Sequence, residues 1–210
     1  MRGIIIASMA VLLTACGSPS IEEKSELSAR TEREAESYIK QKGAAIAFRA
    51  TAAKNFWTNK PRECGNVSLT RVEGDRQLET VEVRTVNEGF RLEGMSDGRE
   101  EGYRIRFTPV QPGKYIVTGL NCNAGEVGRG NGYGIFFGKT DKRPVAGANT
   151  IIIGPGEIVD AGALDFMLLR MNYGILVSHP AASGYRAMIQ KNMPNLYHRI
   201  TFKTFTFGGV

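Results

Sequence analysis

From Ala44 onward, apolar and polar residues alternate with a period of two, and this pattern constrains the fold more than any other feature of the chain. The segment Tyr103-Arg104-Ile105-Arg106-Phe107 is the clearest case. A strand with one face in the core and one face in water produces this alternation. Further strands are expected at residues 44–52, 67–72, 81–84, 115–120, 133–137, 150–153, 158–169, 173–177 and 201–207. Their spacing, with Gly, Pro and Asn between them, predicts a mainly β protein with an antiparallel β-sandwich.

Parity within each strand predicts which side chains face the core. The residues expected to be buried are Tyr103, Ile105, Phe107, Tyr115 and Val117, and the residues expected to face water are Arg104 and Arg106. In the last strand, Phe205 and Phe207 have the same parity, so we expect them on one face.

Two segments have helical features instead. Residues 21–42 follow a capping-box pattern at Ser20 and Glu23, and Gly43 stands where a helix would end. Because apolar residues are few, we expect a largely solvated helical stalk about 33 Å long rather than a core helix. A coiled-coil partner helix is the alternative, although no sustained heptad supports it.

The second helix is expected over residues 183–192, because Tyr185, Met188 and Ile189 recur at helical spacing and should pack on the sandwich. Pro194 then begins a further short helical turn. The expected fold is therefore an antiparallel β-sandwich with an N-terminal charged helix and a C-terminal helix plus strand.

The first fifteen residues have the features of a secretory signal. Arg2 precedes an apolar run from Ile4 to Leu13, about half as long as a membrane-spanning helix. The run ends in Leu13-Thr14-Ala15-Cys16, which resembles the lipobox of bacterial lipoproteins at all four positions. The resemblance implies cleavage between Ala15 and Cys16, a diacylglyceryl thioether on Cys16, and acylation of the new amino group. An ordinary cleaved signal beside an incidental cysteine is the alternative.

The lipobox also predicts how the chain is divided and where it resides. We expect a signal peptide over 1–15, a lipidated cysteine with a helical stalk over 16–43, and the β-sandwich domain over 44–210. Gly17 is not the Asp that retains many enteric lipoproteins in the inner membrane. By resemblance to that sorting rule, we expect a lipid-anchored protein of the outer membrane that faces the periplasm, and the inner membrane is the alternative.

The cysteine count fits this location. Of the three cysteines, Cys16 takes the lipid, which leaves Cys64 and Cys122 as an even pair in a compartment that permits disulfides. We expect these two residues to form a disulfide. Two separate buried thiols are the alternative.

Two Pro-Gly turns carry a second resemblance. Pro112-Gly113-Lys114-Tyr115 and Pro155-Gly156-Glu157-Ile158 each stand between apolar strands, as type II turns require. The first looks like the P-G-x-Y turn of prealbumin-like and carboxypeptidase-regulatory-like β-sandwiches. Together with Gly162 and Met193-Pro194-Asn195-Leu196, the set resembles proteobacterial envelope lipoproteins. This resemblance implies the sandwich fold and brings no catalytic residue with it.

The remaining polar residues match no catalytic or nucleotide-binding pattern. The glycine-rich stretch 125–134 lacks the spacing of a P-loop or of a dinucleotide-binding motif. His179 and His198 lack zinc-ligand spacing, and Ser178 and Ser183 are not placed by sequence to use His179 as a base. Asp160 and Asp165 read as strand-end or turn residues, with a carboxylate pair or a cation site as the alternative. No catalytic residue, metal or cofactor is therefore expected.

Basic residues around the glycine-rich stretch suggest a contact surface. The residues of this basic rim are Arg129, Lys139, Lys142 and Arg143. They could meet lipid phosphates or an acidic partner, and a solvated loop is the alternative. Removing Arg2 with the signal lowers the formal net charge from +6 to +5. No stacked aromatic residues accompany these charges, so nucleic acid is not expected as a partner.

The sequence thus favours a non-enzymatic, lipid-anchored envelope protein that binds or braces an envelope component. Its expected partners are membrane lipid, through acylated Cys16, and an envelope protein. An accessory subunit of a secretion or envelope-assembly complex is the first alternative. An uncharacterised hydrolase or small-ligand binder is the second, and a deep pocket with converging polar groups would favour it.

Overall fold

The computed structural model describes residues 21–52, 62–85, 106–124, 133–137, 143–170 and 173–208. Strands predominate in these residues, and the chain has a mainly β, sandwich-like fold. The elements are α1 (Ile21–Lys42), β1 (Ala44–Ala52), β2 (Arg62–Glu73), β3 (Arg76–Arg84), β4 (Thr108–Val110), β5 (Gly113–Ala124), β6 (Tyr133–Phe137), β7 (Ala148–Ile153), β8 (Ile158–Arg170), β9 (Tyr173–His179), α3 (Ser183–Asn192), α4 (Pro194–Tyr197), β10 (Ile200–Phe202) and β11 (Thr206–Phe207).

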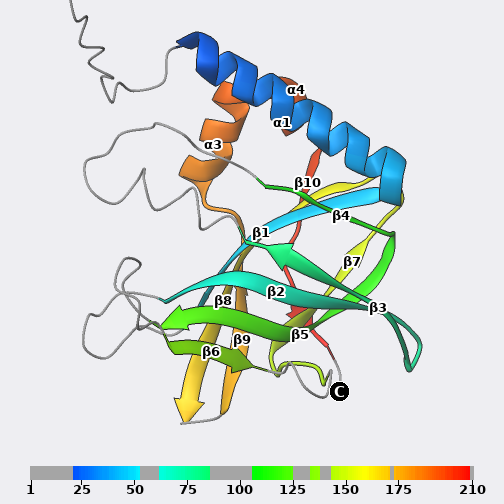
Figure 1. Cartoon of the computed structure of the whole chain (residues 1–210), viewed down its shortest axis with the longest axis vertical. Coiled ribbons are helices and arrows are strands. Elements are labelled where there is room, and N and C mark those ends of the chain that lie inside the picture. The colour runs from blue at the N-terminus through cyan, green and yellow to red at the C-terminus, as the bar shows by residue number, and fades with distance from the viewer. Residues whose placement is uncertain are drawn as a thin grey trace, which may run out of the picture.

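The strands belong to two sheets, which are connected through β2 (Figure 1). In sheet A, β8 lies on one side of β1, while β4 and the first residues of β2 lie on the other side. Strands β9 and β10 pair with different parts of β8. In sheet B, β2 lies between β3 and β5, both β6 and β7 pair with β5, and β11 pairs with β7.

Most strand pairs are antiparallel, as the sequence predicts, but two pairs in sheet A are parallel. Strand β1 is parallel to β8, and β8 is parallel to β10. Parallel neighbours need a long crossover connection, whereas a hairpin can only join antiparallel ones. Between β1 and β8 the chain passes through sheet B, and between β8 and β10 it passes through β9, α3 and α4. These long connections remove the directional constraint that a hairpin imposes.

Strand β1 is buried on both faces, and this accounts for its nearly continuous apolar sequence. One face contributes Ile46 and Phe48 to the core between the two sheets. The other face contributes Ala45 and Ala47 to a second apolar cluster, which lies between sheet A and the helices. The polar residue Arg49 follows on that second face.

Helix α1 packs on the domain, so the expected solvated stalk is wrong for its second half. Ala35 is fully buried, and Tyr38 and Ile39 pack against the cluster under the helices. Glu32 accepts a hydrogen bond from the backbone N–H of Leu196, 3.2 Å away. Figure 1 shows α1 lying along the same end of the molecule as α3 and α4. The helix covers one end of sheet A. Its narrow apolar stripe is sufficient for this packing, because a small residue such as Ala35 lets the helix approach the domain closely.

Helix α3 packs as the sequence predicts. Tyr185 and Ile189 are buried in the cluster between sheet A and the helices, and Met188 packs against it. Its limits, Ser183–Asn192, coincide with the expected range.

The predicted core faces are confirmed where the structure describes them. Phe107, Tyr115 and Val117 are buried, and Arg106 is exposed. Tyr103, Arg104 and Ile105 lie outside the described residues.

The prediction for the last strand is wrong, because Phe205 is buried and Phe207 is 77% exposed. The chain leaves the strand conformation between β10 and β11. Phe205 therefore reaches the core, where its ring lies 5.2 Å from that of Phe48. Strand β11 restarts beside β7 with a register shift between Thr206 and Phe207. This interruption breaks the alternation on which the prediction relied.

The two Pro-Gly corners differ in conformation despite their similar sequences. Gly156 has a φ of 74°, and the N–H of Glu157 donates to the carbonyl of Gly154 at 3.4 Å, as in a type II turn. Gly113 has a φ of 153°, which does not fit that turn type. The first corner is held instead by Tyr115, whose hydroxyl donates to the carbonyl of Gln111 at 2.7 Å.

Candidate functional site

The predicted disulfide is present. Cys64 and Cys122 are bonded and face each other on the adjacent antiparallel strands β2 and β5. Their Cα atoms lie 3.7 Å apart, closer than the usual 4.4–6.8 Å or so of disulfides. Both residues are fully buried in the core between the sheets. A register shift at the next residue, between Cys64 and Asn66, separates this pair from the regular ladder that follows.

Most of the other predicted site residues lie outside the described part of the chain. These are Ala15, Cys16, Arg129, Lys139 and Lys142. Arg143 is described and is exposed in the segment that leads to β7. The basic rim therefore stays a prediction. Among the described helices, none is both long enough and apolar enough to cross a bilayer.

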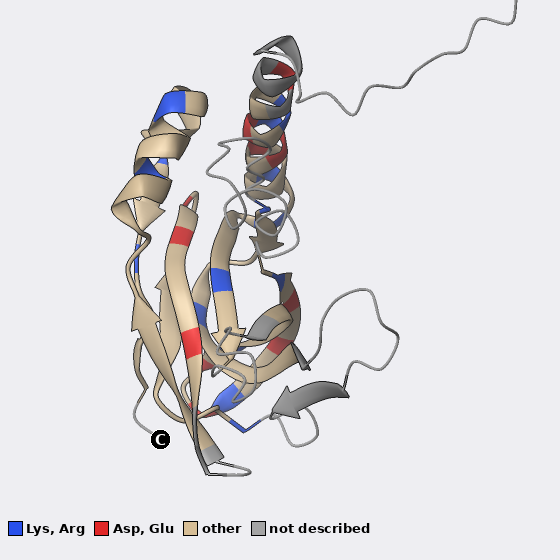
Figure 2. Ribbon diagram, turned by 90° about the vertical axis from the view of Figure 1, so that its left-hand side faces the viewer, with Lys and Arg blue, Asp and Glu red and all other residues tan. Residues whose placement is uncertain are grey.

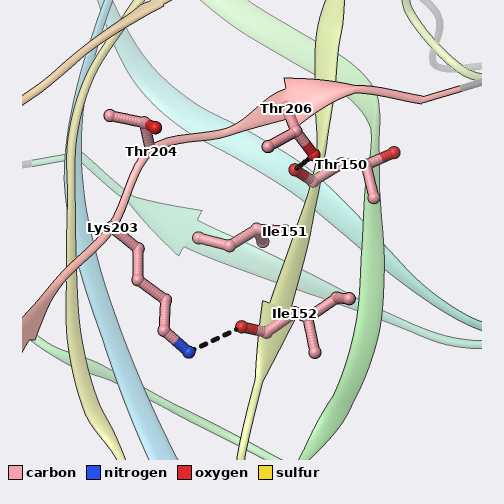
Figure 3. Close-up of a pocket in the computed structure, with 6 residues that line it drawn as sticks. All are labelled: Thr150, Ile151, Ile152, Lys203, Thr204 and Thr206. Carbon is pink, nitrogen blue, oxygen red and sulfur yellow. Dashed lines mark hydrogen bonds between the residues drawn. The ribbon is translucent and has the colours of Figure 1, made fainter.

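An open groove of about 320 Å³ lies between β7 and the C-terminal segment (Figure 3). Its lining residues are Thr150, Ile151, Ile152, Lys203, Thr204 and Thr206. Strand β11 pairs with β7 at Ala148 and Thr150, and the groove adjoins this short pairing. Two large apolar side chains of these same strands are exposed, Ile152 at 64% and Phe207 at 77%. The groove thus combines threonine hydroxyls with exposed apolar side chains.

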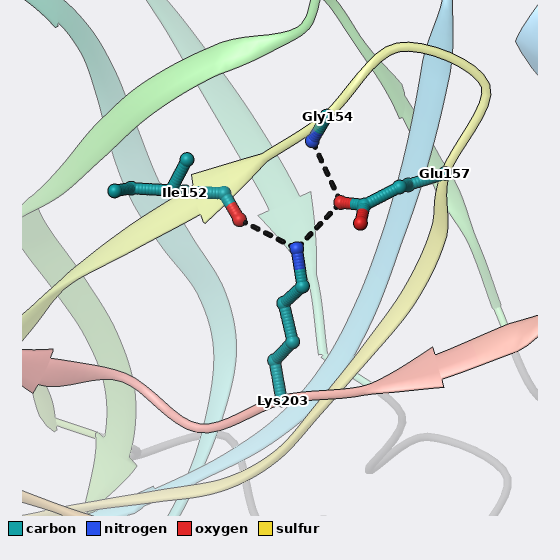
Figure 4. Close-up of polar contacts among 4 residues, drawn as sticks. All are labelled: Ile152, Gly154, Glu157 and Lys203. Atoms are coloured by element: carbon teal, nitrogen blue, oxygen red, sulfur yellow. Dashed lines mark hydrogen bonds and ion pairs between the residues drawn. The ribbon is translucent and has the colours of Figure 1, made fainter.

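Lys203 fixes one side of this groove (Figure 4). Its Nζ donates to the carbonyl of Ile152 at 3.0 Å and to the Glu157 carboxylate at 2.6 Å. The same carboxylate accepts the backbone N–H of Gly154 at 2.6 Å. Burial tends to raise the pKa of Glu157, but the hydrogen bonds from Lys203 and Gly154 outweigh it and lower this pKa. The ammonium group therefore holds β7 and the type II turn to the C-terminal segment.

A buried charged cluster lies on the helical side of sheet A. Asp160 of β8 is 1% exposed, and its Oδ1 accepts the N–H of Gly162 at 2.9 Å. Its Oδ2 is buried without a hydrogen-bond partner among the described residues. Burial raises the pKa of Asp160 to about 6, although the N–H of Gly162 and the charges of Arg49 and Arg186 oppose this. The carboxyl group thus changes between its neutral and charged forms near pH 6.

The two arginines near Asp160 are held by aromatic side chains. The guanidinium of Arg49 lies 4.1 Å from the centre of the Tyr185 ring. That of Arg186 lies 5.2 Å from the centre of the Phe202 ring and also donates to the carbonyl of Ala181 at 3.1 Å. Because these contacts position both cations, they can act on Asp160 through charge without a direct hydrogen bond.

A second set of interacting polar residues spans three strands of sheet A. Thr51 donates a hydrogen bond to one oxygen of Asp165, and Nε2 of His179 lies 3.3 Å from the other. The carboxylate therefore stands between the hydroxyl and the imidazole. Ser178 is used differently, because its hydroxyl accepts the backbone N–H of Phe205 at 2.9 Å. The structure does not bring Ser178 and His179 together as a nucleophile and its base.

Asp160 and Asp165 are expected at a strand end or in a turn. Asp160 is the third residue of β8, so it lies near a strand end rather than in a turn, and it is buried. Asp165 also lies within β8, and the two aspartates hydrogen-bond to different groups. A signal for the buried site was present: a carboxylate interrupts the apolar run from Ile158 to Leu164. The groove had no such signal, since its two sides are separated by about fifty residues along the chain. Among the described residues, no three His, Cys, Asp or Glu side chains converge to hold a metal ion.

Comparisons with known proteins assign no family or function to this chain. No protein-family model matches the chain, and no curated protein or solved structure is similar enough to count as a match. The cysteines, the groove and the charged cluster are therefore the features of this chain that bear on its function.

Proposed function

We propose that this chain is a non-enzymatic, lipid-anchored protein of the bacterial envelope that binds or braces an envelope component. The observation that carries the proposal is the disulfide between Cys64 and Cys122. Disulfides persist mainly in oxidising compartments outside the cytosol. The bond also accounts for two of the three cysteines and leaves Cys16, at the end of the lipobox-like Leu13-Thr14-Ala15-Cys16, for lipid.

The groove beside β7 supports a macromolecular partner better than a small ligand. Small-ligand sites enclose most of the ligand within a concave pocket that has converging polar groups. This groove is open, and the exposed side chains of Ile152 and Phe207 belong to strands at its edge. Exposed apolar side chains on the two strands beside an open groove would suit contact with another macromolecule. The same surface would serve the alternative role of an accessory subunit in a secretion or assembly complex.

The arrangement of polar side chains supports a non-enzymatic role. Asp165 binds the imidazole of His179, while the hydroxyl of Ser178 is occupied by a backbone N–H. Asp160 is too deeply buried to meet a substrate without local opening. These groups are used within the fold.

The anchor is tested by replacing Cys16 with Ala in cells that are fed labelled fatty acid. The wild type should incorporate label and sediment with the outer membrane on a density gradient. The Cys16→Ala variant should lack label and accumulate as uncleaved precursor or as soluble protein. Label on the variant would refute the anchor, and wild-type protein at the density of the inner membrane would refute the proposed location.

Partner binding is tested by photo-crosslinking in intact cells, with the crosslinker placed at Ile152. Leu78 of β3, also exposed, provides the matched control position. A product specific to position 152 that weakens in a Phe207→Ala background would support binding at the groove. Equal products at both positions would contradict it. A stoichiometric protein product would favour the accessory-subunit role.

A further inference from the structure

The three described helices are gathered at one end of the molecule (Figures 1 and 2). We call α3, α4 and the N-terminal half of α1 the helical end. Contacts of the second half of α1 hold the whole helix against α4 and the residues after it: Glu32 accepts the N–H of Leu196, and Glu36 forms an ion pair with Arg199. Buried Ala35 adds apolar contact with the cluster that contains Ile189. Because α1 cannot swing as a free stalk while these contacts persist, its direction fixes the orientation of the domain.

The length of chain before α1 limits how far the helical end can lie from a lipid on Cys16. Five residue steps separate Cys16 from Ile21, the first residue of α1. A chain covers at most about 3.6 Å per residue, so the two Cα atoms lie within about 18 Å of each other. Helix α1 alone is about 33 Å long at 1.5 Å per residue. The segment between Cys16 and Ile21 is thus shorter than helix α1. If Cys16 carries the lipid, the N-terminal end of α1 must stay near the bilayer surface.

The surface of α3 and α4 suits lipid headgroups. Its exposed side chains include the polar or cationic residues Gln190, Lys191, Asn192, Asn195 and His198, together with Arg199, which is paired with Glu36. Ala187 and Pro194 are exposed as well. Met193 and Leu196 point into the cluster below and are buried. No Asp or Glu occurs after Asp165 in the sequence, and Figure 2 shows Lys and Arg without acidic residues on α3. Such a surface can meet phosphate groups, and among the described residues of α3 and α4 no large apolar side chain is exposed for insertion into the hydrocarbon.

The first half of α1 carries Glu22, Glu23 and Glu26 together with the basic residues Lys24 and Arg30, whereas the acidic residues of its second half are engaged within the protein. Glu32 and Glu36 bind the α4 segment, and Glu34 pairs with Arg30 at 3.0 Å. Their charges are therefore partly compensated before the domain meets a membrane.

We propose that the helical end rests on the phospholipid headgroups of the membrane that holds Cys16, with the groove beside β7 directed away from that membrane. The inference rests on the lipid anchor proposed above. Strands β7 and β11, which flank the groove, pair with each other on the side of the sheets away from the N-terminal end of α1 (Figure 1). The orientation leaves the groove open to a partner in the surrounding compartment.

The test uses the full-length lipidated protein in vesicles of phosphatidylethanolamine and phosphatidylglycerol that contain a lipid with a nitroxide on its headgroup. A fluorophore is attached through Asn195→Cys in α4, or through Asp75→Cys in the β2–β3 turn as the control. Both positions are exposed. Because Cys64 and Cys122 are bonded to each other, and Cys16 is acylated in the tested protein, the introduced thiol is the one that reacts.

The nitroxide should quench the fluorophore at position 195 several-fold more than the one at position 75. Quenching that is equal at the two positions, or stronger at 75, would overturn the orientation. Flotation of the protein with the vesicles is measured in the same samples and reports the anchor separately. Failure of wild-type protein to acquire lipid or to float would overturn the proposed anchor, and this inference with it.

Discussion

Buried polar groups on the outer sides of the two sheets are satisfied to different degrees. On sheet B, the hydroxyl of Thr70 lies 2.9 Å from that of Thr80 and 2.8 Å from that of Thr118, so neighbouring strands satisfy one another. On sheet A, Asp160 has one oxygen bonded to Gly162 and the other without a partner. Hydroxyls both donate and accept, so they can form a chain, whereas a carboxylate can only accept. Sheet B therefore gains stability from its buried polar groups, while the stability of sheet A depends on whether Asp160 is protonated.

The disulfide sharpens this contrast, because it connects two strands of sheet B. Replacing both Cys64 and Cys122 by Ala should lower the free energy of unfolding by about 4 kcal/mol, from the entropy of the unfolded chain. The two cysteines are 58 residues apart. Urea titration of the oxidised wild type and the double variant measures the loss, with the reduced wild type as control. An unchanged midpoint would mean that the bond does not constrain the unfolded state as supposed.

Replacing two glycines that have similar φ angles distinguishes the cost of backbone strain from the cost of steric overlap. Gly162 (φ 71°) lies in the β8 bulge, where a Cβ would overlap the carbonyl oxygen of His179. Gly156 (φ 74°) has open space at its Cβ position. Left-handed backbone costs a residue with a Cβ about 1–2 kcal/mol, and crowding adds roughly 1–3 kcal/mol. Thermal unfolding should show Gly162→Ala losing about 3–4 kcal/mol and Gly156→Ala about 1 kcal/mol. Equal losses would show that the bulge relaxes freely.

Protonation of Asp160 should give the fold a pH dependence that is specific to sheet A. Its folded pKa of about 6 lies above the ordinary value of 3.8. The stability that protonated Asp160 adds to the folded state is therefore fully present below pH 3.8 and is lost as the pH rises through 6. The difference corresponds to roughly 3 kcal/mol. Denaturation at several pH values should show this decline in the wild type and not in Asp160→Asn, whose amide does not titrate. The same decline in both proteins would assign it to another group.

Removing one hydroxyl from the sheet B chain should have the smallest effect. Thr70→Val keeps the side-chain shape and leaves Thr118 with a longer hydrogen bond, 3.4 Å, to the carbonyl of Ser68. The expected loss is about 1 kcal/mol. Thr206→Val is the matched control, because Thr206 is exposed and water can replace its bond to Thr150. If the two variants lose equal stability in urea titrations, burial of the hydroxyl chain has no added effect.

The sequence predicted local structure better than long-range contacts. The limits of β1, β6 and α3 agree with the expected ranges, because local periodicity determines them. The disulfide pairing followed from the cysteine count. The break in the apolar run at Asp160 signalled a buried carboxylate. The groove and the arginines of the charged cluster could not be predicted, because they involve residues that are far apart in sequence and approach only in the folded domain. Arg186 acts on Asp160 from a helix that follows it by more than twenty residues.

Helix α1 and the last strand show a different limit. A thin apolar stripe on α1 suggested solvation, yet Ala35 packs closely because it is small. Alternation placed Phe205 and Phe207 on one face, but the break between β10 and β11 separated them. In both cases, tertiary contacts decided the outcome where the local pattern was weak.

The parallel pairing of β1 with β8 has a consequence for the timing of folding during synthesis. Thr51 and Asp165, which bond across these strands, are 114 residues apart. Strand β1 therefore leaves the ribosome long before its partner exists, and β10 completes the sheet only near the end of the chain. Contacts so distant in sequence slow folding, because the intervening chain must first be ordered. Sheet A thus stays incomplete during most of synthesis, a delay that would suit the secretory signal proposed for residues 1–15, which is read before the protein folds.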